Sequence, residues 1–366
     1  MPTHSILRSL LSAYRRFQYA FTGRPRYGVM KPGEEVKVEP FRFEDNHGDI
    51  VHPCIRYIPE RYEGHYWWMV YTPYYNADSS MENPILCYSD ENDKNNPPTE
   101  WKVYGLVNEK PEKGYNSDPT LLYKDCQLYV FWRENYEKGS QPFYRATFAA
   151  KVANGGFERI TEPLLRTDDP EIDAETCPCF MPSYDGKVVA YGMHLRFHSP
   201  RIKRMSPFFK KWAERIVLVT DLLGGYSQQK HYGLAIWEQG SEDWLKPYHH
   251  QNTMRFKECN KLYSPWHMDF FDWQGRRYCV VQTNQCNADV ALAVSEDNMS
   301  FTFLKKPLIS NDTIGKLGIY KPCAGVTPDG IFFLYYTAQD PDNRALNKLY
   351  LTTIKFEDLL AKINGE

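Results

Sequence analysis

The sequence has 366 residues, of which 42% are hydrophobic and 25% are charged. This length fits two average domains or one large β architecture, and the composition excludes a disordered, collagen-like or low-complexity chain. The formal net charge is −2, from 44 basic and 46 acidic residues, which argues against a nucleic-acid partner. Aromatic residues make up 15% of the chain, beside 25 Pro and 22 Gly, and this mixture favours strands and tight turns over long helices.

The 9 cysteines are scattered along the chain without paired C-x-x-C motifs. Most of them fall in apolar, strand-like runs, so we expect buried thiols in a reducing compartment rather than a disulfide framework. No stretch approaches the ~18 apolar residues of a membrane-spanning helix. Arginines interrupt the apolar positions at the N-terminus, which argues against a secretory signal peptide. The expected location is the cytoplasm, with peripheral membrane attachment as an alternative.

The first predicted element is a basic amphipathic helix within residues 1–30. Apolar residues recur at helical spacing after Ser5, and Gly23 and Pro25 end the pattern. All the charged residues before Glu34 are basic. Three roles are open: packing on the main body or on a second subunit of a homodimer, binding to an anionic membrane surface, or acting as a transit peptide. We favour packing.

From residue 50 onward one pattern repeats: a short strand that opens on or near a polar residue, a turn, and a second strand rich in aromatic residues. The openings of these hairpins are His52, Asp118, Met181, His267 and Lys321. Further strand-like segments follow, giving about four strands per unit, as in the blades of β-propellers. We therefore predict an all-β fold, a five-bladed β-propeller over residues 45–360, with an insertion in the third blade at about 196–215.

Three segments carry a resemblance to a known family: Asn116–Tyr123 (NSDPTLLY), Trp67–Tyr74 (WWMVYTPY) and Ala293–Phe301 (AVSEDNMSF). They resemble the five-bladed propellers of the family 43 glycoside hydrolases and their relatives among arabinanases, invertases and levansucrases. The resemblance implies hydrolysis of a glycosidic bond by three carboxylates at one mouth of the central channel. One protonates the leaving oxygen, one activates water or attacks the anomeric carbon, and the third orients its neighbours and tunes their pKa values.

Only one of these three carboxylates stands at its expected position. Asp118 before Pro119 matches the tuning carboxylate that the resemblance implies. His52 stands where the resemblance implies a base Asp. The third blade reads Cys179–Pro182 where an acid should precede the proline, and the nearest acid is Glu175. Other polar groups must therefore complete a catalytic site.

We predict that this site combines acids and histidines of the inner strands. His267 and Asp269 share one face of their strand, so the carboxylate could raise the pKa of the histidine and fix its tautomer. The predicted catalytic residues are Asp118, Asp269, His267, Glu134 and Glu82. The predicted substrate-binding residues are His52, Arg133, Trp266, Asn83 and Lys321. Each also has a structural alternative, such as a turn, a satisfied channel histidine or an ion pair.

No cofactor is predicted. Cys177, Cys179, His194 and His198 could be read as zinc ligands, but a Cys-x-Cys pair lies outside the usual spacing and no second cysteine pair completes it. A channel cation such as calcium is suggested only by analogy with the resembling family. The expected partner is an oligo- or polysaccharide.

The resulting prediction is a glycoside hydrolase-like, carbohydrate-active protein that cleaves a glycosidic bond of an unusual or anionic glycan in the central channel. Two alternatives stay open. One is a noncatalytic propeller that binds glycans after losing the acids. The other is a peripheral-membrane component of polysaccharide biosynthesis, held by the basic N-terminal helix and the basic insertion.

Overall fold

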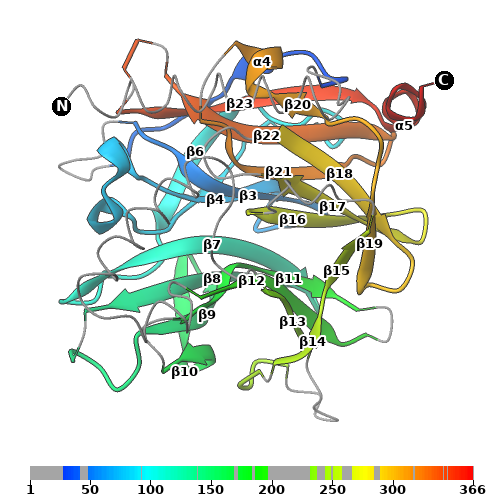
Figure 1. Ribbon diagram of the computed structural model, residues 1–366. Helices are drawn as coiled ribbons and strands as arrows, with labels where there is room; N and C mark the ends of the chain where they lie inside the picture. Colours follow the sequence, from blue (N-terminus) through cyan, green and yellow to red (C-terminus); the bar gives the residue numbers. More distant parts are fainter. Residues whose placement is uncertain are drawn as a thin grey trace, which may run out of the picture.

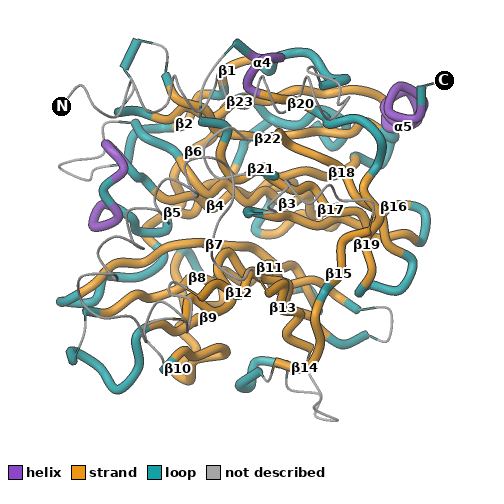
Figure 2. Tube along the Cα trace, viewed as in Figure 1, coloured by secondary structure: helices purple, strands orange, loops and turns teal. Residues whose placement is uncertain are grey.

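The computed structural model describes residues 28–41, 48–91, 93–137, 139–168, 172–183, 186–196, 231–236, 244–248, 250–257, 266–283, 289–315, 318–340, 342–343 and 345–365. The predicted N-terminal helix and the insertion at 196–215 lie almost entirely outside these residues. Strands dominate the described part of the chain (Figure 2). None of its helices is long and apolar enough to cross a membrane.

The described strands form five sheets (Figure 1). The first contains β3 (Val51–Tyr62), β4 (His65–Thr72), β5 (Ile85–Tyr88), β6 (Glu100–Leu106) and β2 (Lys37–Val38). The second contains β7 (Gly114–Lys124), β8 (Gln127–Tyr136), β9 (Arg145–Ala153) and β10 (Gly156–Thr167). The third contains β11 (Ile172–Pro182), β12 (Val188–Arg196), β13 (His231–Ile236) and β14 (His250–Thr253).

The fourth and fifth sheets complete the fold. The fourth contains β16 (Met268–Trp273), β17 (Arg276–Gln282), β18 (Asp289–Ser295), β19 (Ser300–Phe303) and β15 (Arg255–Lys257), and β20 (Ile309–Ser310) pairs with β18. The fifth contains β21 (Tyr320–Val326), β22 (Ile331–Gln339), β23 (Asn347–Lys355) and β1 (Glu34–Glu35). The helices of the described residues are α4 (Asn311–Ile314), α5 (Phe356–Asn364) and the short 3-10 turns η1 (Tyr75–Ala77) and η2 (Ser79–Met81).

The inner strands of the sheets contact one another in a closed cycle. Strand β3 contacts β7, β7 contacts β11, β11 contacts β16, β16 contacts β21, and β21 contacts β3 again. The sheets therefore surround a common axis, and the predicted all-β class with a propeller-like arrangement is confirmed. The predicted hairpins at the openings of the first, second, fourth and fifth sheets are present as the pairs β3–β4, β7–β8, β16–β17 and β21–β22.

The ring closes where the first and last sheets meet. Strand β1 pairs with β23 of the fifth sheet, and β2, two residues later, pairs in parallel with β6 of the first sheet. Asp49 is completely buried at this seam and accepts hydrogen bonds from the backbone N–H groups of Tyr74 and Asn347 and from the Asn347 side chain. One carboxylate thus joins the first and last sheets.

Aromatic side chains pack neighbouring sheets against each other. The Phe131 and Phe180 rings stack at 4.0 Å between the second and third sheets, and Tyr191 and Phe270 stack at 4.1 Å between the third and fourth. Helix α5 follows β23 at one end of the fifth sheet (Figure 1), and its buried Phe356 contacts Phe332 of that sheet and Phe271 of the fourth. The aromatic excess of the sequence is therefore used mainly in the core.

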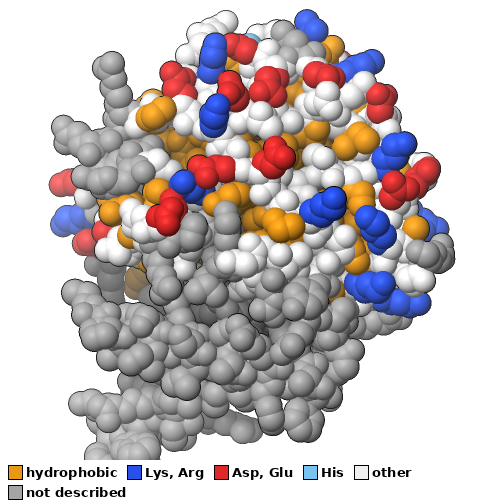
Figure 3. All heavy atoms as spheres, turned by 90° about the horizontal axis from the view of Figure 1, so that it is seen from above, with side chains coloured by type: hydrophobic (Ala, Val, Ile, Leu, Met, Phe, Trp, Pro, Cys, Tyr) orange, Lys and Arg blue, Asp and Glu red, His pale blue; other side chains and the backbone are white. Residues whose placement is uncertain are grey.

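The described part of the face seen from above carries side chains of both charges, interspersed with apolar ones (Figure 3). No large area of a single sign is visible on that part. This distribution agrees with the balanced composition of the chain.

Candidate functional site

Three inner strands share one irregularity at an X-Pro pair. His52, Asp118 and Lys321 each precede a proline and each has a positive φ, of 53°, 50° and 20° respectively. At each pair the inner strand contains one residue more than its partner strand, which is a β-bulge. A positive φ is costly for residues with a Cβ, so the surrounding sheets must hold it. Proline is tolerated here because the inner strand is the edge of its sheet.

The third sheet corrects one prediction. We expect its inner strand to open at Met181-Pro182, whereas β11 ends at Pro182. Between Thr176 and Cys179, β11 has one residue more than its partner β12, which is a bulge. Cys177 therefore occupies the position in β11 that His52 occupies in β3. Two X-Pro pairs follow one another closely in this segment, and the local pattern does not reveal which of them forms the bulge.

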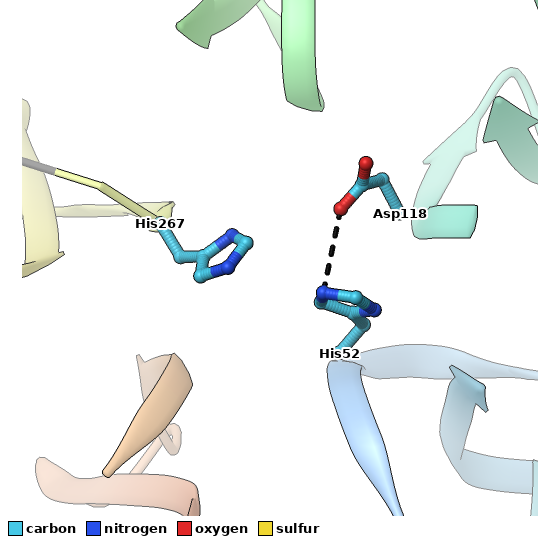
Figure 4. Close-up of side chains that lie close together, drawn as sticks. All are labelled: His52, Asp118 and His267. Atoms are coloured by element: carbon cyan, nitrogen blue, oxygen red, sulfur yellow. Dashed lines mark ion pairs between the residues drawn. The ribbon is translucent and has the colours of Figure 1, made fainter. Parts of the chain in front are cut away.

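His52, Asp118 and His267 meet at one end of the channel (Figure 4). One possible ligand atom from each lies within 4.8 Å of those of the other two, and all three side chains are buried. The His52 Nε2 atom is 3.5 Å from Asp118 Oδ1, and the two imidazole centroids are 5.1 Å apart. Burial and the nearby His52 hold the pKa of His267 well below its usual value. The His267 ring is therefore neutral at pH 7, so one of its nitrogens carries a lone pair rather than a proton.

The other ring nitrogen of His52 faces a second carboxylate. His52 Nδ1 lies 3.2 Å from Glu82 Oε2 and 3.0 Å from Thr72 Oγ1. Burial raises the pKa of Glu82, while hydrogen bonding and the charge of His52 act in the opposite direction. Glu82 and Thr72 orient the ring from one side, and Nε2 on the other side makes no hydrogen bond with the described residues.

Asp118 is held as an anion. Arg133 Nη2 lies 2.6 Å from Asp118 Oδ2, and the Ser117 hydroxyl also donates to this oxygen. Burial alone would raise the pKa of Asp118, but the charges of Arg133 and His52 outweigh it and hold the pKa far below its usual value. Asn135 in turn donates to Ser117 Oγ at 2.9 Å. The carboxylate is thus fixed in position and charge.

Lys321, Tyr320 and Trp266 surround the same end of the channel. The buried Lys321 ammonium donates to the Pro119 carbonyl at 2.8 Å. The Tyr320 ring centroid is 4.4 Å from that of His267 and 5.1 Å from that of His52, and the Trp266 ring is 5.6 Å from His267. Tyr320 is not among the residues predicted from the sequence, where its only signal is its place directly before Lys321.

Asp269 lies one layer away from this cluster and is engaged elsewhere. Arg56 Nη2 and Nη1 lie 2.8 Å and 3.1 Å from its two carboxylate oxygens, and the backbone N–H of Ala324 donates to it at 3.2 Å. The predicted His267–Asp269 pair therefore needs correction. Alternation places both on one face, but they stand at different depths along the axis, and Arg56 binds the carboxylate. Burial would raise the pKa of Asp269, but Arg56 outweighs it and keeps the pKa below its usual value.

Glu134 and Asn83 also lie outside the cluster. Glu134 Oε1 is 2.9 Å from Arg159 Nη2 and accepts a hydrogen bond from Trp132 Nε1 at 3.1 Å. Strand alternation turns Glu134 away from the channel because its neighbour Arg133 points into it. Asn83 accepts a hydrogen bond from Asn116 Nδ2 at 2.7 Å. The zinc interpretation cannot be followed further, because His198 and the side chains of Cys177 and His194 lie outside the described residues.

Comparison with solved structures establishes the type of fold. No protein-family model matches the chain, and no curated protein matches its sequence. A family 43 glycoside hydrolase from Xanthomonas citri superposes with a TM-score of 0.52 at 11% identity, covering 83% of this chain and 87% of that chain. The chain has the β-propeller fold of these hydrolases. A xylan β-1,4-xylosidase from Bacillus halodurans gives 0.55 at 12% identity over 89% of this chain but only 54% of its own length.

A further solved structure is similar over nearly its whole length. It is an N-acetylgalactosamine deacetylase from F. plautii, in complex with blood group B trisaccharide. Its TM-score is 0.67 at 13% identity, and the alignment covers 92% of this chain and 97% of that chain. At sequence identities of 11% to 13%, these similarities establish the fold that the proteins share.

Proposed function

We propose that the protein hydrolyses a sugar-containing substrate at the channel end formed by His52, Asp118 and His267, and that these three residues hold a divalent transition-metal ion. The observation that carries the proposal is the convergence of two imidazoles and one ionised carboxylate, all buried, within 4.8 Å. This donor set suits Zn²⁺, Fe²⁺ or Mn²⁺ better than Ca²⁺, which prefers six or more oxygen ligands.

The surroundings of His52 fit the same proposal. A metal-binding histidine commonly has its second ring nitrogen fixed by a carboxylate, and Glu82 stands 3.2 Å from His52 Nδ1. A metal of this kind supplies Lewis acidity and lowers the pKa of water. The chain itself keeps Asp118 ionised through Arg133 and keeps His267 neutral through burial. Lys321 adds a buried positive charge, which favours negative charge developing on a substrate.

The bond that we favour is an acyl bond on a sugar, an amide or an ester. Glycosidic hydrolysis needs two carboxyl groups about 5 to 9.5 Å apart across the bond, and two of the predicted acids, Asp269 and Glu134, are bound by Arg56 and Arg159. The similarity to a solved N-acetylgalactosamine deacetylase supports the acyl bond. Glycosidic cleavage is the second candidate, because the fold is that of family 43 hydrolases and because Asp118 and Glu82 flank His52.

The test separates these activities by their products. Purified protein is stripped with a chelator, reloaded with single divalent metals, and incubated with N-acetylated and O-acetylated saccharides while acetate and new reducing ends are both measured. We expect acetate release that chelation abolishes and metal restores, and loss of at least ~100-fold in His52→Ala and Asp118→Asn.

Glu134→Gln is the matched control, because this acid lies outside the cluster. Reducing ends without acetate would instead support glycosidic cleavage. Saccharide binding with neither product would make the protein a noncatalytic glycan-binding propeller. Acetate release that survives complete metal removal would overturn the metal site.

A further inference from the structure

Sulfur atoms line the channel one layer below the His52 cluster. Cys54 and Cys323 each stand two residues after a bulge residue, His52 and Lys321 respectively, and Cys179 stands two residues after Cys177. All three thiols are free and buried. None of them is used by the proposed hydrolysis.

Cys54 and Cys323 lie close together in this layer. Their Sγ atoms lie within 4.8 Å of each other and of an Asp269 oxygen. Cys323 Sγ also accepts the backbone N–H of Ile55 at 3.0 Å, so it contacts the residue next to Cys54. Cys179 differs, because its thiol donates to Asp269 Oδ1 at 3.4 Å.

The charges around the pair argue against a metal ion in this layer. Asp269 is already bound by both terminal nitrogens of Arg56. The same guanidinium lies 3.9 Å from Cys323 Sγ and 3.5 Å from Cys179 Sγ. A cation placed among these sulfurs would therefore sit beside a fixed positive charge.

The position of the pair in the ring gives it a structural consequence. Cys54 belongs to β3, the inner strand of the first sheet, and Cys323 belongs to β21, the inner strand of the last sheet. Noncovalent contacts close the ring between these sheets, through β1, β2 and Asp49. We propose that Cys54 and Cys323 form a reversible disulfide under oxidising conditions, which joins the first and last sheets covalently.

The chemistry requires a hydroperoxide as oxidant. With hydrogen peroxide, one thiol sulfur attacks a peroxide oxygen and the O–O bond breaks. The sulfur becomes a sulfenic acid, and the other oxygen takes up the thiol proton and leaves as water. The second thiol then attacks the sulfenic sulfur, forms the S–S bond and releases a second water. Two thiols thereby lose two protons and two electrons, and the peroxide gains them. A dithiol reverses the step.

We place the entry of a small oxidant at the other end of the channel. A cavity of about 240 Å³ is lined there by residues that include Ile55 and Ala324, the residues that directly follow Cys54 and Cys323. This volume accommodates a molecule of the size of peroxide. Formation of the bond needs the two sulfurs, which now lie within 4.8 Å of each other, to approach to ~2.05 Å.

The test uses the full chain carrying Cys126→Ser, which removes an exposed thiol. The folded protein is treated with hydrogen peroxide, blocked with an alkylating reagent, digested without reduction and analysed by mass spectrometry. We expect a peptide in which Cys54 is linked to Cys323. The unfolding midpoint should rise by roughly 5 to 10 °C, because a bond that closes so long a loop restricts the unfolded chain. Dithiothreitol should reverse both effects.

Two variants sharpen the result. Cys323→Ser should lose both the linked peptide and the rise in the midpoint, while Cys87→Ala should retain both, because Cys87 is buried in β5 away from the channel. Peroxide oxidation of other cysteines without a Cys54–Cys323 link, or a link that forms only in urea, would overturn the proposal. The mass-spectrometric readout on the parent chain does not depend on how well either variant folds.

Discussion

His52 and Asp118 occupy the same position on neighbouring inner strands, and their side chains meet with Nε2 and Oδ1 3.5 Å apart. Each is the residue before a proline, at a bulge, with a φ near 50°. The backbone strain at both positions is held by the sheets around them, so the approach of the two groups is built into the fold before any ligand binds.

Arg133 should control the charge of Asp118. Arg133→Met removes the cation that holds the pKa of Asp118 down, so that pKa rises because burial is then opposed less. Asp118 stabilises the folded protein above its unfolded pKa of ~3.9, and this contribution is lost as the pH falls toward the folded value. The variant should lose metal affinity at a higher pH than the parent, as measured by calorimetric titration with Zn²⁺ between pH 5 and 8. Arg159→Met is the control, and an equal shift in both variants would contradict this role.

Asp269 should act in stability rather than in chemistry. Asp269→Asn leaves the partly buried Arg56 without the buried carboxylate that it binds and should cost roughly 3 to 5 kcal/mol of unfolding free energy, measured by urea denaturation. The double variant Arg56→Met/Asp269→Leu should recover part of this loss, since neither charge is then buried alone. Full stability with abolished hydrolysis in Asp269→Asn would instead restore the catalytic role that alternation with His267 predicts.

Glu134 tests whether the catalytic site is limited to the residues around His52. Glu134→Gln replaces the carboxylate that binds Arg159 and accepts from Trp132, so it should lower the unfolding free energy by about 1 to 3 kcal/mol. Hydrolysis should stay within a few-fold of the parent, because no contact joins Glu134 to the His52 cluster among the described residues. A loss of kcat comparable to that of Asp118→Asn would place Glu134 in the catalytic machinery.

Asp49 should hold the ring closed. Asp49→Ala removes the acceptor for three hydrogen bonds at the seam between the first and last sheets and should lower the unfolding free energy by roughly 2 to 4 kcal/mol. Thermal unfolding of the reduced protein measures this loss. Oxidation of Cys54 and Cys323 should offset part of it, because the disulfide closes the same seam. Equal midpoints for the parent and the variant would show that Asp49 does not support closure.

The repeated hairpins are readable from the sequence because each combines a polar opening, a tight turn and an aromatic second strand. The third opening is misplaced by this reasoning, since Cys177-Pro178 and Met181-Pro182 both fit the pattern and only pairing with β12 distinguishes them. His52, Asp118 and His267 are each recognisable as candidates, and the predicted propeller places them in one channel because its inner strands surround one axis. Which of the ten predicted residues lie closest to one another is not readable from the sequence, because it depends on the depth of each side chain along that axis. Strand alternation predicts which face of a strand a side chain is on, but not how deep it lies along the channel axis. For this reason the predicted pairing of Asp269 with His267 is wrong.

The bulge at each X-Pro pair fixes the position of a side chain at the end of the channel but not the type of residue that stands there. The same backbone arrangement presents an imidazole at residue 52, a carboxylate at residue 118 and an ammonium group at residue 321. Three positions around this end of the channel therefore share one backbone geometry while their side chains differ in charge and in the atoms they offer to a ligand. Lys321→His, for example, would place a third imidazole at this end of the channel, where the Lys321 ammonium now donates to the Pro119 carbonyl.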